Sequence, residues 1–168
     1  MSIELHTDNL IIKKPSEVHL NFLIKELNNW NISQWLVNVP YPYTIDDAKY
    51  WLKKTKADDY CFNIFIKNIL IGGISITNKK NNTNPELGYW IGEDYWGKGY
   101  ANEACTNLIK YFFLNTSHNI IYASHMKGNI KSKKILINLG FEFVKTGKKF
   151  SISRNEIVDD LDYQLIKS

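Results

Sequence analysis

The alternation and spacing of apolar residues predict a mixed sheet with helices between its strands. Runs typical of strands occur at residues 5–14, 60–66, 69–76, 86–91, 120–123, 141–145 and 162–166. Helical spacing predicts helices that begin near residues 16, 44, 100 and 130, with an irregular helical piece at 30–39. The first half is rich in hairpins and the second half reads as strand, helix, strand, so the order predicts a mixed α/β (α+β) fold.

One stretch, residues 86–104, carries the clearest chemical signal. A strand is followed by a turn at residues 92–94, by Gly97 and Gly99, and then by a helix. The first turn of a helix has unpaired backbone N–H groups and a favourable dipole, and glycine allows close backbone approach. The stretch therefore predicts a site for phosphate or pyrophosphate. It matches neither a P-loop, which ends in Gly-Lys-Ser/Thr, nor the dinucleotide fingerprint, which needs a third glycine.

Composition narrows the class of protein. The 168 residues are 44% hydrophobic and 23% charged, with a net charge of +4, which suits one globular domain over residues 1–168. The lysines are dispersed, so we expect no nucleic-acid partner. No apolar run reaches the ~20 residues that span a bilayer, so we expect no membrane association and a cytoplasmic location. Cys61 and Cys105 lie in apolar patterns and are expected to be buried thiols. The histidines have no metal-ligand spacing, so no metal is expected: His6, His19, His118 and His125.

Four segments together resemble one known family. YWGKGYANEA at residues 95–104 and NIKSKKILINLGFEFV at 129–144 resemble the GNAT superfamily of N-acetyltransferases. DNLIIKKP at residues 8–15 and VPYPYTIDDAKYWL at 39–52 resemble its RimJ/RimL-type branch. The resemblance implies a single N-acetyltransferase domain with a central twisted, mostly antiparallel sheet. It implies about seven strands with a splayed parallel pair, flanked by about four helices.

The resemblance also implies acetyl-CoA as the acetyl donor. The family's pyrophosphate loop matches Trp96, Gly97, Lys98, Gly99, Tyr100 and Ala101, with tryptophan in place of the leading Gln/Arg. In the family, a bulge in the preceding strand opens a gap for the pantetheine arm. The backbone that pairs with this arm corresponds to Trp90, Ile91 and Gly92. Asn129 matches the residue that contacts the pantetheine chain, and Ser132 the residue near the sulfur.

Amine acetylation needs a general base, a donor for the developing oxyanion and an acid for the thiolate. Glu86 matches the base of several relatives; otherwise it is a solvated carboxylate at a strand end. Many relatives use a tyrosine on the last helix as the acid, but Leu136 fills that position here. Ser132 is then the candidate acid, and its alternative is an N-cap or surface serine. Glu103 either lines the cleft or simply benefits from the helix dipole.

The acceptor is the open part of the prediction. Candidate pocket residues are Trp35, Tyr41, Tyr43 and Tyr89, each of which could equally belong to the core. The RimJ/RimL-type resemblance favours a protein N-terminal α-amine. A polyamine, an amino-acid derivative or an aminoglycoside is the alternative, and Asp46, Asp47, Asp58 and Asp59 hint at a cationic one. The chain could also be an idle acetyl-CoA sensor or an unrelated nucleotide-binding protein. We expect a monomer or a homodimer.

Overall fold

A single eight-stranded sheet organises the chain, with strand order β1-β2-β3-β4-β5-β6-β8-β7. The computed structural model describes residues 3–56, 58, 60–78 and 84–167. All neighbouring strands are antiparallel except the central pair of β5 and β6, which is parallel. The strands are β1 (Glu4–His6), β2 (Ile11–Lys13), β3 (Cys61–Ile66), β4 (Ile69–Asn78), β5 (Pro85–Ile91), β6 (Ile120–Met126), β7 (Glu142–Ser151) and β8 (Glu156–Ile166).

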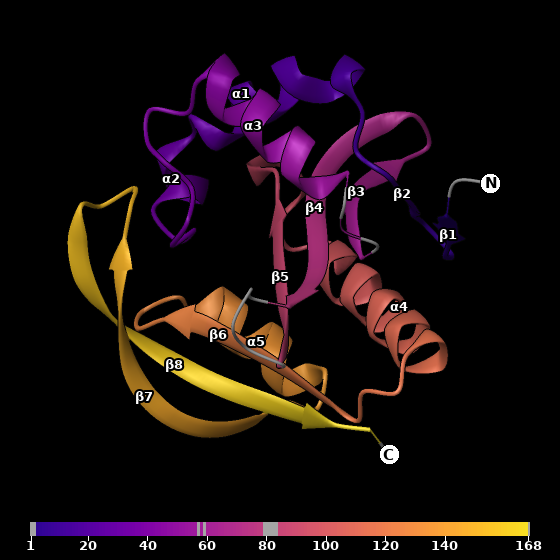
Figure 1. The fold of residues 1–168 in the computed structure, drawn as a ribbon, viewed down its shortest axis with the longest axis vertical. Coiled ribbons are helices and arrows are strands. Elements are labelled where there is room, and N and C mark those ends of the chain that lie inside the picture. Colours follow the sequence, from indigo (N-terminus) through magenta and orange to yellow (C-terminus); the bar gives the residue numbers. More distant parts are fainter. Residues whose placement is uncertain (1–2, 57, 59, 79–83, 168) are drawn as a thin grey trace.

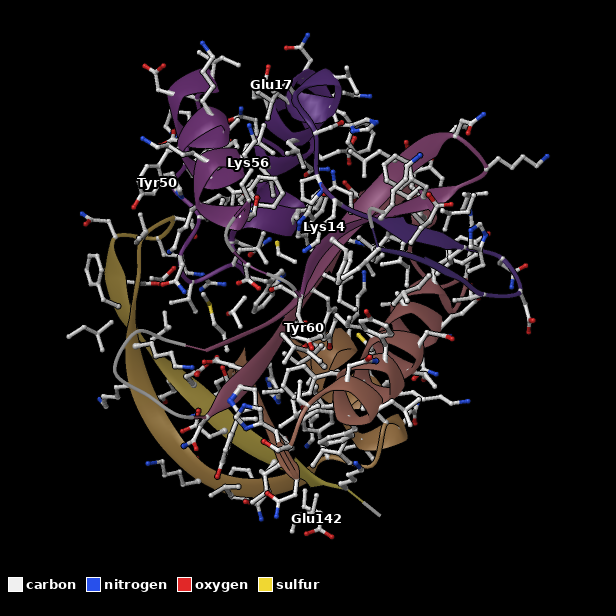
Figure 2. All side chains as sticks on the ribbon, turned by 45° about the vertical axis from the view of Figure 1, so that its right-hand side comes forward. Lys14, Glu17, Tyr50, Lys56, Tyr60 and Glu142 are labelled. Atoms are coloured by element: carbon white, nitrogen blue, oxygen red, sulfur yellow. The ribbon has the colours of Figure 1, made fainter. Side chains whose placement is uncertain are left out.

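Helices cover the two faces of this sheet separately (Figure 1). On one face lie α4 (Tyr100–Asn115) and α5 (Ile130–Asn138), above a large core that includes Phe62, Leu108 and Ile121. On the other face, η1 (Glu17–His19), α1 (Leu20–Leu27), α2 (Trp30–Ser33) and α3 (Ile45–Thr55) pack around a second core. Glu17 and Lys56 form an ion pair of 3.8 Å across this helical layer (Figure 2).

Local signals set several element ends as predicted. Thr44 caps α3 through a capping box with Asp47, since each side chain bonds the other's backbone N–H. Gly140 ends α5 with φ +86°. The predicted turn at residues 67–68 joins β3 to β4, with Lys67 at φ 55°.

Three predicted elements differ from those observed. Residues 5–14 form two short strands because Thr7 N–H bonds the Leu10 carbonyl at 3.0 Å and turns the chain. This raises the number of strands from about seven to eight. The last two strands are a long hairpin, since charged residues continue each ladder: Lys149 pairs with Val158, and Lys145 with Asp162. The helical piece at 30–39 is the four-residue α2, and it makes five α-helices within the described residues.

The sheet divides at its centre. β5 and β6 form only two residue pairs, Glu86 with Tyr122 and Leu87 with Ala123. Beyond these pairs β5 follows β4, while β6 follows β8 as far as Met126. Figure 1 shows β6 turning away from β5 towards the curved β7–β8 hairpin. The predicted splayed parallel pair is confirmed, and the gap that it opens positions the candidate site.

Candidate acetyl-transfer site

The family resemblance implies a bulge in β5 as the cause of the splay, but β5 has no bulge in its pairing with β4. β5 pairs with β4 in continuous register from Asn78–Pro85 to Gly72–Ile91. The irregularity lies in β4, where Ile71 has no partner in β3 between the pairs Phe65–Leu70 and Ile64–Gly72. The Ile71 carbonyl accepts the Gly92 N–H at 2.8 Å, which holds the end of β5 against β4.

Two adjacent glycines in β4 allow this close approach. A Cβ on Gly72 would clash with the Trp90 carbonyl, and a Cβ on Gly73 would lie 2.7 Å from Trp90 Nε1. A larger residue at either position would therefore push β5 towards the gap. The Gly-Gly pair within an apolar strand was visible in the sequence, but its role depends on the neighbouring strand.

Of the three predicted backbone residues, Ile91 faces the gap, whereas Trp90 and Gly92 do not. Trp90 and Gly92 direct their peptide groups towards β4, as the Gly72 contact and the Ile71 hydrogen bond show. The Ile91 carbonyl accepts the Trp96 indole N–H at 2.7 Å. Because successive peptide groups in a strand point to opposite sides, the N–H groups of Tyr89 and Ile91 face the gap. These two N–H groups are therefore the candidate donors to the pantetheine arm or the oxyanion.

The glycine loop has the geometry of an anion cradle. Gly97 and Gly99 adopt φ +74° and +83°, and a Cβ on either would have nothing within 4 Å. The first intrahelical bond of α4 runs from Glu103 N–H to the Gly99 carbonyl. The N–H groups of Tyr100 and Ala101 thus belong to the unpaired first turn. Residues 97–101 fit a pyrophosphate through backbone alone.

Two lysines lie beside this loop. The Lys98 ammonium donates to the Asp94 carbonyl at 2.9 Å and folds over Tyr95 rather than reaching across the loop. The exposed Lys131, on α5, lies 3.7 Å from the centroid of the Trp96 ring. Sequence reasoning missed Lys131 because its position beside Trp96 comes from packing between distant segments.

Asn129 and Ser132 meet at the start of α5. Asn129 is the N-cap, and its Oδ1 accepts the Ser132 N–H at 3.1 Å. Ser132 is therefore not the cap, and its hydroxyl is available for another partner. That partner is the Tyr89 hydroxyl at 2.9 Å. Leu136, where many relatives have a tyrosine, is fully buried in the core.

Glu86 lies beside a hollow of about 290 Å³ on the face opposite α5. The hollow is lined by Val37, Asn38, Glu86, Ser124, Lys149 and Phe150. Glu86 lies one residue before the last β5–β6 pair, Leu87–Ala123, and Ser124 follows Ala123 directly in β6. The hollow thus lies next to the point where β5 and β6 part.

Lys149 holds the charges of this hollow together. Its ammonium donates to Ser124 Oγ at 2.7 Å, contacts Asp160, and lies 3.7 Å from Glu86 and 3.8 Å from Asp162. Burial alone would lower the pKa of Lys149, but the bond to Asp160 and the charges of Glu86 and Asp162 outweigh it and raise the pKa. Three carboxylates around one ammonium leave the cluster net negative. Neither Lys149 nor Asp160 was predicted from the sequence.

The aromatic acceptor candidates are dispersed. Trp35 stacks on Arg154 at 5.0 Å, and Tyr41 is exposed beside Trp30. Tyr43 is buried in the second core, which raises its pKa to about 12, and its N–H donates to Asn28 Oδ1 at 2.8 Å. Tyr89 lies on the α4–α5 side of the sheet, away from the hollow. None of the four lines the hollow; Val37, two residues after Trp35, does.

Other acidic candidates have structural partners. Glu103 accepts from Thr7 Oγ1 at 2.5 Å and from Asn9 N–H at 2.8 Å, so it fastens the β1–β2 turn to α4. Burial would raise the pKa of Glu103, but these hydrogen bonds outweigh it and lower the pKa. Asp47 belongs to the capping box of α3, and Asp59 lies outside the described residues.

Comparison with known proteins now identifies the family. The family model of the acetyltransferase (GNAT) domain matches residues 9–142. The chain belongs to the GNAT acetyltransferase family. Among GNAT relatives, it is 31% identical over 110 residues to p20, an uncharacterised N-acetyltransferase of Bacillus licheniformis, covering 63% of this chain. It is 27% identical over 128 residues to YnaD, an uncharacterised N-acetyltransferase of Bacillus subtilis, covering 74% of this chain and 75% of YnaD. The match spans 61% of p20, less than two thirds of that relative.

A solved GNAT structure shares the fold. RimL, the ribosomal L7/L12 α-N-protein acetyltransferase, solved in complex with coenzyme A, superposes with a TM-score of 0.83 and 16% identity. The superposition covers 98% of both chains. The predicted GNAT resemblance is thus confirmed by the family model, and RimL shares the fold of this chain. Among the described residues, no helix has the length and apolar character to cross a membrane.

Proposed function

We propose that this GNAT chain transfers an acetyl group from acetyl-CoA to a primary amine by direct attack, with a protein N-terminal α-amine as the favoured acceptor. The single observation that carries the proposal is that the hollow beside Glu86 lies next to the point where β5 and β6 part. The β5–β6 gap leads to the glycine loop on one side, and the 290 Å³ hollow opens on the other. A donor thioester in the gap and an amine in the hollow would meet there.

The residues present fit coenzyme A as the donor co-substrate. Residues 97–101 would hold the pyrophosphate, and the N–H groups of Tyr89 and Ile91 would pair with the pantetheine arm or polarise the thioester carbonyl. Lys131 supplies a cation beside the loop. When bound, the co-substrate supplies an activated acetyl group.

The remaining steps belong to the chain itself. Glu86 accepts the proton that the amine loses when it attacks the carbonyl carbon, directly or through water. The new C–N bond forms while the C–S bond breaks. Ser132, on the opposite side of the gap from Glu86, donates a hydrogen bond to the departing sulfur. No acyl-enzyme is required, and Cys105 is fully buried in the core.

Two observations bear on the class of acceptor. RimL, which shares the fold, is named as an α-N-protein acetyltransferase, and this supports an N-terminal α-amine. The net negative cluster of Glu86, Asp160, Asp162 and Lys149 supports the alternative of a small cationic amine such as a polyamine. Both alternatives place an ammonium group near the same carboxylates.

A thiol-release assay tests the function. We expect turnover with peptides that have a free α-amine, and loss of turnover when that amine is blocked. Glu86→Gln should lower kcat by about 100-fold while the Kd of coenzyme A stays unchanged. Glu142→Gln, an exposed carboxylate at the start of β7, is the matched control. Preference for spermidine over all peptides would favour a polyamine as the acceptor instead of an N-terminal α-amine. Tight coenzyme A binding without turnover on any amine would contradict the enzyme and favour an acetyl-CoA sensor.

A further inference from the structure

The hydroxyl of Tyr89 contacts Ser132 rather than the acceptor hollow. Tyr89 is the second residue of β5 after the last β5–β6 pair, and its ring packs partly buried against the α4–α5 core. Its hydroxyl lies 2.9 Å from Ser132 Oγ and 3.5 Å from the Ser132 carbonyl. A phenol therefore reaches the same serine that the proposed reaction uses, although it comes from a strand and not from α5.

The hydrogen bond between the Tyr89 and Ser132 hydroxyls can have either residue as its donor. If Ser132 donated to Tyr89, the tyrosine proton would need another acceptor, and the Ser132 carbonyl at 3.5 Å is at the outer limit for one. Burial, with a smaller effect of the nearby Cys105, raises the pKa of Tyr89 well above its usual range, so the phenol keeps its proton. Because Ser132 Oγ at 2.9 Å is the nearer of the two acceptors, we assign the Tyr89 O–H as the donor to it.

Ser132 is then held at two points. Its N–H is fixed by Asn129 Oδ1 at 3.1 Å, and its oxygen accepts from Tyr89. The serine proton has to point away from Tyr89, and a hydroxyl that accepts one hydrogen bond becomes a better donor of the next.

We infer that Tyr89 is a positioning residue that fixes the Ser132 hydroxyl and directs its proton towards the sulfur that leaves in acetyl transfer. This inference rests on the proposed function. It gives a physical reason for the absence of a tyrosine on α5: Leu136 packs in the core, and Tyr89 from β5 acts through Ser132 instead.

The test is a double-mutant cycle with Tyr89→Phe and Ser132→Ala. Tyr89→Phe should lower kcat about fivefold to tenfold, as for loss of one hydrogen bond, while the KM for acetyl-CoA stays within about twofold. Ser132→Ala should lower kcat by about 100-fold. In the Ser132→Ala background, Tyr89→Phe should have no further effect, because the hydroxyl that it orients is gone.

Tyr111→Phe is the matched control, since Tyr111 packs at the edge of the same core from α4. It should leave kcat unchanged. Thermal melts and the Kd of coenzyme A check that each variant is folded. Unchanged kcat in Tyr89→Phe, or losses that multiply in the double variant, would overturn the role of Tyr89 and leave the proposed function intact. Absence of turnover in the unaltered protein would overturn both.

Discussion

The two halves of the candidate site differ in composition: one consists of backbone groups and the other of side chains. On the donor side, the glycine loop and the edge of β5 offer backbone N–H groups whose directions follow from φ angles and strand alternation. On the acceptor side, the hollow is made of side chains from four separate elements or loops, held by charges around Lys149. A backbone site tolerates changes of side chain, whereas a side-chain site can acquire a new specificity by substitution. The difference explains how one fold can keep its donor and change its acceptor.

Gly99→Trp gives the largest effect expected for the donor side. The side chain would fill the open space of the cradle, and φ +83° disfavours any residue with a Cβ. We expect the Kd of coenzyme A to rise by more than about 100-fold, or about 2.7 kcal/mol. Isothermal titration calorimetry measures it.

Gly140→Trp is the control for backbone strain. Gly140 has a similar φ of +86° but lies at the end of α5, near Leu165. It should lower thermal stability without changing coenzyme A affinity. Normal affinity in a folded Gly99→Trp protein would show that the donor pyrophosphate binds elsewhere.

Lys149→Met tests the charge cluster of the acceptor side. Asp160 is 1% exposed and would lose its cation. The free energy of unfolding should fall by about 2–3 kcal/mol, less than for a fully enclosed pair because Lys149 is 28% exposed. Urea unfolding measures the loss.

Adding Asp160→Asn to Lys149→Met should recover at least half of that stability, since the uncompensated charge is removed. Coenzyme A affinity of both folded variants should match that of the unaltered protein, because the donor side is separate. A Lys149→Met variant as stable as the parent would mean that the cluster does not support the hollow.

The features that could be predicted from the sequence are the local backbone features of the donor side, and those that could not are the side chains that the acceptor side gathers from distant segments. The loop at residues 97–101, the Thr44 cap and the helix at 130–138 are local, so residue types and spacing specify them. The acceptor hollow unites Val37, Glu86 and Lys149, whose proximity depends on the register of a hairpin not visible in the pattern. The sequence leaves Tyr89 open between the acceptor pocket and the core, and only the packed structure places it against the α4–α5 core.

Glu103→Gln has the smallest expected effect, and it tests whether Glu103 belongs to the donor site or has only a structural role. Although Glu103 is in the first turn of α4, it bonds Thr7 and Asn9. At pH 7 the variant should lose about 1 kcal/mol of unfolding free energy while coenzyme A affinity stays within about twofold. Glu142→Gln serves again as the exposed control.

The pH dependence of that loss has a definite sign. The folded protein lowers the pKa of Glu103 below its ordinary 4.5, so the ionised form stabilises the fold above that value. The contribution disappears as pH falls through the folded pKa. Urea unfolding at pH 7 and pH 3.5 should therefore show the difference between parent and variant shrinking on acidification. A difference that grows towards pH 3.5 would contradict the assigned hydrogen bonds.

The small number of residue pairs between β5 and β6, only two, bears on the stability of the folded protein. The strands β1–β5 and the strands β6–β8 are two ladders with a short seam between them. A ligand that pairs along the open part of the seam acts as a missing strand and joins the ladders. At a ligand concentration 100 times its Kd, such binding stabilises the folded state by about 2.7 kcal/mol. In the proposed function, occupancy by coenzyme A would therefore raise the stability of the fold as well as supply the acetyl group.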